Sequence, residues 1–136
     1  MFGHSQPEQE FEQMPHTPEN IVVWAEIPVT DMARSIAFYA SVLNTELTLD
    51  DSGPNPMAVL PTADKMGVAG HLYPGKPAPE GTGPTIHLAC PDALSAARER
   101  VEQAGGKVMS GVMEIPDGLF FYCLDPDGNS IGLFTR

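Results

Sequence analysis

An internal repeat of 61 residues is the feature that most constrains how this chain can fold. Asp31 and Asp92, each predicted to begin a helix, are 61 residues apart, and so are Leu72 and Leu133 in the predicted last strands. One offset that aligns separate elements without a gap indicates two copies of a βαβββ unit. A single unit has too few elements to bury a core, so both copies are expected to form one domain.

The first copy begins with a stretch that alternates between apolar and polar residues over 24–29, which is typical of a half-buried strand. A helix is predicted after it, with Asp31 as its N-cap and Asn44 as its left-handed end. The apolar stripe of this helix is predicted to be Met32, Ile36, Tyr39 and Leu43. Short strands are predicted over 45–50, 57–61 and 68–73.

The second copy repeats this order. A strand over 85–90 precedes a helix over 92–104, which Asp92 is predicted to cap and Gly105 to end. The buried face of this helix is predicted to be Leu94, Ala97, Val101 and Ala104. Further strands are predicted over 107–113, 119–124 and 130–134.

These patterns predict an α+β fold of two tandem βαβββ modules, with both helices on the convex side of a curved sheet and a concave cup on the other. Residues 1–19 are acidic and show no helical or strand periodicity. This predicts a flexible tail before a single domain over 20–136. The Pro- and Gly-rich stretch 74–84 predicts a linker between module one, 21–73, and module two, 85–135.

The amino-acid composition limits the classes of partner that this chain is expected to bind. The net charge is −11 with only seven Lys and Arg, which argues against nucleic acid and is compatible with a neutral or cationic small ligand. No apolar run is long enough to span a membrane, and no basic segment leads into an apolar stretch at the N-terminus. Two cysteines are too few for a disulfide framework. We therefore expect reduced thiols, no membrane association and a cytoplasmic location.

The doubled unit resembles the vicinal oxygen chelate superfamily of glyoxalases, bleomycin-resistance proteins and extradiol dioxygenases. The segment Glu26–Asp31 with the helix after it is similar to the first strand and helix of that group, and 125–129 (Asp-Pro-Asp-Gly-Asn) to its terminal turn. The segments 70–72 and 104–108 resemble an uncharacterised glyoxalase-like branch. The resemblance implies a small-molecule ligand in the cup and a homodimer, and a monomeric mass in light scattering would refute the latter.

Strand alternation predicts which side chains face the cup, because residues two apart share a face. If Ile27 and Val29 face the helix, the residues that alternate with them along the strand face the concavity, and the repeat places the corresponding residues of the other copy there too. The predicted cup-facing residues are Trp24, Glu26, His71, Tyr73, Thr85, His87, Gly132 and Phe134.

The resemblance implies metal ligands at four of these positions, namely Trp24, His71, Thr85 and Gly132. Only His71 is a good ligand there, which argues against lactoylglutathione lyase and iron dioxygenase chemistry. A replacement set of Glu26, His71 and His87 could bind Zn, Ni, Mn or Fe if the three converge. A metal-free cup is favoured, in which Glu26 and His87 could still act as general acid and base.

Substrate contacts are predicted from Trp24, Tyr73, Thr85 and Phe134, with further aromatic wall either from Phe120 and Tyr122 or from Phe121. The arginines of the two helices (Arg34, Arg98 and Arg100) are predicted to be solvated. Cys90 shares the alternation of Ile86 and Leu88, which predicts a buried and unreactive thiol.

Two functions from different classes remain open. One is a glyoxalase-type lyase or isomerase with a degenerate metal site, acting through Glu26, His71 and His87. The other is a non-catalytic protein that encloses a small molecule of antibiotic type. Metal uptake together with turnover lost in Glu26→Ala and His87→Ala would favour the enzyme, and ligand binding unaffected by a chelator, without product, would favour the binder.

Overall fold

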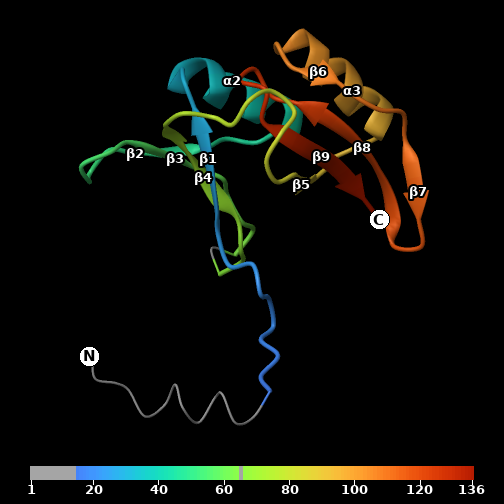
Figure 1. Ribbon diagram of the computed structural model, residues 1–136, viewed down its shortest axis with the longest axis horizontal. Coiled ribbons are helices and arrows are strands. Elements are labelled where there is room, and N and C mark those ends of the chain that lie inside the picture. Colours follow the sequence, from blue (N-terminus) through green and yellow to red (C-terminus); the bar gives the residue numbers. More distant parts are fainter. Residues whose placement is uncertain (1–14, 65) are drawn as a thin grey trace.

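The computed structural model describes residues 15–64 and 66–136, which form two βαβββ modules side by side (Figure 1). Residues 1–14 of the tail predicted over 1–19 lie outside the described residues. Module one contains β1 (Ala25–Val29), α2 (Met32–Leu43), β2 (Thr48–Asp50), β3 (Met57–Val59) and β4 (Gly70–Pro74). Module two contains β5 (Ile86–Ala89), α3 (Leu94–Gln103), β6 (Lys107–Val108), β7 (Met113–Ile115), β8 (Gly118–Leu124) and β9 (Ser130–Thr135).

Each module has its own mixed sheet. The strand orders are β1-β4-β3-β2 and β5-β9-β8-β6, with β7 paired to β8, and the first strand of each sheet runs parallel to the last strand of its module. The repeat holds in these parallel pairs, because Ala25 pairs with Gly70 and Ile86 pairs with Ile131, both 61 residues later. Within the described residues, no ladder joins β1 to β5, so the predicted curved surface consists of two sheets.

One apolar core links the two modules. Helices α2 and α3 pack against each other, and both lie at the same end of the molecule (Figure 1). The residues they bury meet the inward faces of both sheets, which is how two incomplete units together exclude water from a core. The fully buried large side chains are Ile27, Val29, Phe38, Tyr39, Val42, Leu72, Val101, Phe121, Ile131 and Leu133.

The ends of α2 agree with the sequence. The Asp31 carboxylate accepts a hydrogen bond from the backbone N–H of Arg34, and Asn44 adopts the left-handed conformation that ends the helix. The buried face is rotated from the prediction: Phe38, Tyr39 and Val42 are buried, whereas Met32, Ile36 and Leu43 are only partly so.

The prediction that Asp92 caps the second helix is wrong. Helix α3 begins two residues later, at Leu94, and Ala93 at its N-cap makes no side-chain hydrogen bond. The Asp92 carboxylate instead pairs with both terminal nitrogens of the Arg100 guanidinium, at 2.8 and 2.9 Å. These hydrogen bonds lower the pKa of Asp92. Gly105, with φ of 101°, follows the helix end as predicted.

All three helix arginines contact other residues, and the prediction that they are solvated is wrong for the half-buried Arg98 and Arg100 but not for Arg34, whose side chain is 46% exposed. Arg34 pairs with Asp127, and Arg100 reaches the carbonyl of Val42 in the other module as well as Asp92. Arg98 lies over the ring of Phe121 and donates to the carbonyl of Ser110.

The strand predicted over 107–113 is divided into β6 and β7. Between them, the Ser110 hydroxyl accepts a hydrogen bond from the backbone N–H of Tyr122, at a position where a continuous strand would offer a carbonyl. The backbone carbonyl of Ser110 also accepts a hydrogen bond, from the guanidinium of Arg98 at 2.6 Å. Side-chain bonds therefore replace part of the ladder and interrupt the strand.

The turn 125–129 fastens module two to module one. Asp125 is 2% exposed and accepts hydrogen bonds from the hydroxyl of Tyr39, at 2.7 Å, and from the side-chain amide of Asn129. Asp127 accepts from the backbone and hydroxyl of Thr30 and from Arg34, at the start of α2. We call this set of contacts the inter-module clasp.

No helix in the part of the chain that the structure describes is both long and apolar enough to cross a membrane.

Candidate functional site

The predicted site residues lie in two groups, one on each sheet. On the first sheet, Glu26 and His71 are register partners in the parallel pair of β1 and β4, so their side chains lie side by side on one face. The Trp24 indole N–H donates to Nδ1 of His71 at 2.8 Å, and the ring of Tyr73 lies 6.1 Å from the imidazole. His71 is thus held between two aromatic rings, with Nδ1 already engaged.

The second group surrounds His87 on β5. Its imidazole makes edge contacts with three rings, those of Phe120 at 5.3 Å, Tyr122 at 5.7 Å and Phe134 at 6.4 Å between centroids. Two of these rings come from β8 and one from β9, so the sheet itself arranges them. His87 makes no hydrogen bond or ion pair with another residue in the described part of the chain, and it is exposed. Packing positions this imidazole, and its polar atoms remain available to a ligand.

Gly132 provides the space in which His87 lies. The two residues are partners across β5 and β9, and a Cβ at position 132 would lie 2.4 Å from Nδ1 and 2.6 Å from Cε1 of His87. Real side chains do not approach that closely, so any other residue would have to displace the imidazole. An aromatic ring that covers a strand glycine is a known way to stabilise such a position.

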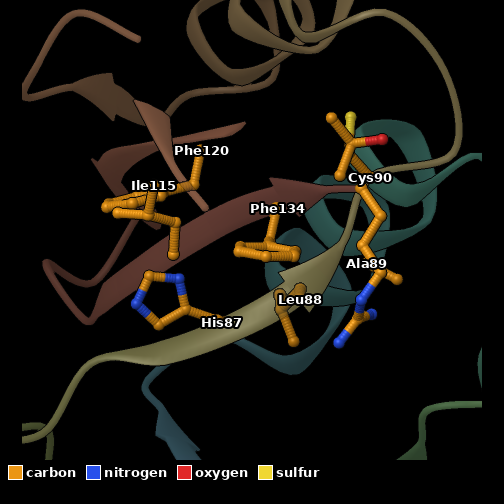
Figure 2. A pocket seen from close by; sticks show the side chains of 9 residues that line it. His87, Leu88, Ala89, Cys90, Ile115, Phe120 and Phe134 are labelled. Atoms are coloured by element: carbon orange, nitrogen blue, oxygen red, sulfur yellow. The ribbon is translucent and has the colours of Figure 1, made fainter. Parts of the chain in front are cut away.

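A cavity of about 680 Å³ opens beside this cluster. Figure 2 shows the ring of Phe134 in its middle, with His87, Phe120 and Ile115 toward one end and Cys90 toward the other. Nine residues line the cavity: His87, Leu88, Ala89, Cys90, Ile115, Phe120, Phe134, Thr135 and Arg136. Most of this surface is apolar, and the few polar groups are an imidazole, a thiol, a hydroxyl and a guanidinium.

The residues at the four metal positions implied by the resemblance do not fit a metal. Trp24 has no atom that coordinates a cation, Gly132 has no side chain, and the Thr85 hydroxyl shares a hydrogen bond of 2.6 Å with Ser130. His71, the one good ligand, has its Nδ1 engaged with Trp24.

The replacement set of Glu26, His71 and His87 is not assembled either. Over 15–64 and 66–136, no group of three or more His, Cys, Asp and Glu side chains is placed to hold a metal ion. Glu26 lines a smaller cavity with linker residues, apart from the cavity of His87. Strand alternation gave the face of each residue, but the packing of the two modules decides which faces meet.

The structure settles which aromatic residues accompany His87. Phe120 and Tyr122 contact its imidazole, whereas Phe121 points into the core under Arg98. Of the predicted substrate contacts, Phe134 lines the cavity, and Trp24, Tyr73 and Thr85 do not.

Arg136, Cys90 and Ile115 line the cavity without having been predicted to do so. Arg136 could have been found from alternation, because it is two residues beyond Phe134 and four beyond Gly132. Cys90 is half-buried rather than buried, and it lies just past the end of β5 at the cavity wall. Ile115 comes from β7, whose separate existence depends on the interruption at Ser110.

We expect the two thiols to differ in reactivity. Cys123 is fully buried, and this burial together with nearby Asp125 raises its pKa to about 12, so little thiolate forms at neutral pH. Cys90 is half-buried at the cavity wall. An aromatic disulfide reagent should therefore modify one thiol of the folded protein, both thiols after unfolding, and neither in folded Cys90→Ser. Modification of folded Cys90→Ser would contradict this assignment.

Comparison with known proteins gives one family and a set of similar folds. The model of the Glyoxalase/Bleomycin resistance protein/Dioxygenase superfamily matches residues 21–133. A comparison with curated proteins gives no match.

Several solved structures share the fold. A glyoxalase/bleomycin resistance protein from Albidiferax ferrireducens T118 is 21% identical, with a TM-score of 0.63 over 86% of this chain and 100% of that one. The fosfomycin resistance protein FosX from Mesorhizobium loti is 16% identical, with a TM-score of 0.61 over 88% and 94%. A glyoxalase I mutant from Zea mays is 20% identical, with a TM-score of 0.60 over 82% and 45%. At these identities the similarity shows the fold alone.

Proposed function

Because the chain belongs to the Glyoxalase/Bleomycin resistance protein/Dioxygenase superfamily, we propose that it binds a small, largely apolar organic molecule in the cavity beside His87. The observation that carries the proposal is the cavity itself, about 680 Å³, lined by aromatic and aliphatic side chains with a few polar groups. This size and composition are typical of small-molecule sites. His87 is the polar contact at its aromatic end.

Binding is favoured over metal-dependent lyase or isomerase chemistry. The donor set at the superfamily's four metal positions does not fit a metal, and Glu26 and His87 line different cavities rather than one acid–base site. What remains in the His87 cavity is a packed imidazole among three aromatic rings. That arrangement supports recognition of a flat, apolar ligand.

The test uses a neutral aromatic probe, naphthalene carboxamide, titrated into isotopically labelled protein and followed by backbone amide shifts. The shifts are expected to concentrate on β5, β8 and β9. Phe134→Ala should weaken binding about tenfold or more, because it removes a large apolar contact. The matched control is Tyr73→Ala, which removes an aromatic side chain from the other sheet and should leave the affinity unchanged. Equal losses in both variants, or shifts spread over the first sheet, would refute the proposal.

A further inference from the structure

The cavity beside His87 differs in charge from the rest of the molecule. The chain has 18 Asp and Glu against seven Lys and Arg, yet none of the nine residues that line this cavity is acidic, whereas Arg136 and His87 are both among them. We propose that the ligand of this cavity is a planar aromatic carboxylate, with its acid group bound by Arg136 and its ring held by Phe134, Phe120 and His87. This inference rests on the proposed function, since it names the class of ligand for the same cavity.

The guanidinium of Arg136 is placed to bind an anion. It lies 5.5 Å from the centroid of the Phe134 ring, in the geometry of a cation–π contact. The ion pairs within the described residues join Arg34 to Asp127 and Arg100 to Asp92, so no described Asp or Glu side chain pairs with Arg136. A guanidinium that rests on a ring keeps its in-plane N–H groups free, and these groups match the two oxygens of a carboxylate.

The aromatic rings favour a flat molecule. The planes of Phe120 and Phe134 are within 17° of parallel, with centroids 6.3 Å apart, and the His87 imidazole stands nearly perpendicular to both. Figure 2 shows the ring of Phe134 in the middle of the cavity and those of His87 and Phe120 toward one end. This arrangement suits a planar ligand ring, which can stack on the face of a phenylalanine and contact the imidazole of His87 by its edge. Since Arg136 lies over Phe134, the carboxylate of such a ligand would be at the ring edge nearest the guanidinium.

The test compares three probes of nearly the same shape: naphthalene carboxylate, the neutral carboxamide and the cationic naphthylmethylamine. Affinities are measured by amide shifts on the whole chain. The carboxylate is expected to bind about tenfold more tightly than the carboxamide, the ratio typical of one charge-assisted contact, and the amine more weakly than both. Arg136→Gln should remove the preference for the carboxylate and leave carboxamide binding intact. Lys107→Gln, which makes the same change in net charge on exposed β6, should preserve the preference.

The outcomes separate this inference from the proposed function. If carboxylate and carboxamide bind equally at β5 and β9, the acid group is not recognised and this inference fails while the cavity remains a binding site. If Lys107→Gln reduces the preference as much as Arg136→Gln does, a diffuse charge effect replaces specific recognition, and the inference also fails. If none of the three probes binds near His87, both proposals are wrong.

Discussion

Replacing Asp125 by alanine is expected to lower the free energy of unfolding by about 3 kcal/mol or more, since each buried donor left without a partner costs about 1–3 kcal/mol. The Asp125 carboxylate accepts hydrogen bonds from the Tyr39 hydroxyl, from the backbone N–H groups of Asp127 and Asn129, and from the Asn129 amide. Both Asp125 and Tyr39 are almost fully buried, so water cannot replace the bond between them. Denaturant unfolding measures the change.

Two variants calibrate this result. Tyr39→Phe removes only one of the bonds to Asp125, the one from the Tyr39 hydroxyl in the other module. It should cost about 1.5–3 kcal/mol, as expected for a hydrogen bond to a charged group. Asp117→Ala removes an exposed carboxylate from the turn between β7 and β8 and should change stability by less than about 0.5 kcal/mol. An Asp125→Ala protein as stable as Asp117→Ala would show that the inter-module clasp does not hold the modules together.

The pH dependence of stability gives a second measurement of the same contact. Burial, and then the adjacent Asp125 charge, raise the pKa of Tyr39 well above its usual value. An unfolded tyrosine loses its proton near pH 10, before the folded one does, so stability should fall as the pH rises through this range. Cys123, with its pKa raised to about 12, contributes a fall in the same direction that begins near pH 8.5. Tyr39→Phe should therefore reduce the alkaline slope without abolishing it.

The parallel strand pairs could be predicted because they follow local alternation. Ile27 and Leu72 in one module, and Leu88 and Leu133 in the other, are register partners with the 61-residue offset preserved. The offset fails in the third strand, where Ala58 pairs with Leu72 but Leu133 pairs with Phe121, two residues beyond the repeat position. Module two has two more residues before this strand and two fewer after it, so the offset returns in the last strand, and hydrophobic period alone does not record such a shift.

The helix start at Asp92 was mispredicted for a related reason. A carboxylate before a helix can cap the backbone or pair with a cation, and the choice depends on which partner lies nearby in three dimensions. Here Arg100 provides two charge-assisted hydrogen bonds to Asp92, which are stronger than a capping bond to a backbone N–H. In the first module Arg34 pairs with Asp127 instead, and Asp31 remains free to cap.

For the site, alternation predicted the faces of His71 and His87 but not their separation. Which faces meet depends on the contact between α2 and α3 and on the inter-module clasp, both of which join residues far apart in sequence. The sequence also marked Gly132 as a missing ligand. In the structure the same residue has a positive role, because its lack of a side chain makes room for the imidazole of His87.

Gly132→Ala is therefore expected to weaken binding of naphthalene carboxamide about tenfold or more while leaving the protein folded. The added Cβ would lie 2.4 Å from Nδ1 of His87, and the exposed imidazole can swing away more easily than the strand can move. Its displacement would cost the edge contacts with Phe120, Tyr122 and Phe134 and would change the shape of the cavity. The free energy of unfolding should change by only about 1 kcal/mol, the value typical of point substitutions.

A double-mutant cycle attributes the loss to His87. Once His87→Ala has removed the ring, adding Gly132→Ala should cause no further loss of affinity, because the new methyl group has nothing left to displace. Gly111→Ala is the matched control, since a Cβ there meets nothing within 4 Å, and it should bind the probe as the parent does. The imidazole resonances of His87, which lie beside three aromatic rings, should shift in Gly132→Ala and not in Gly111→Ala. Unchanged affinity and unchanged imidazole resonances in Gly132→Ala would show that the absent side chain at this position does not shape the cavity.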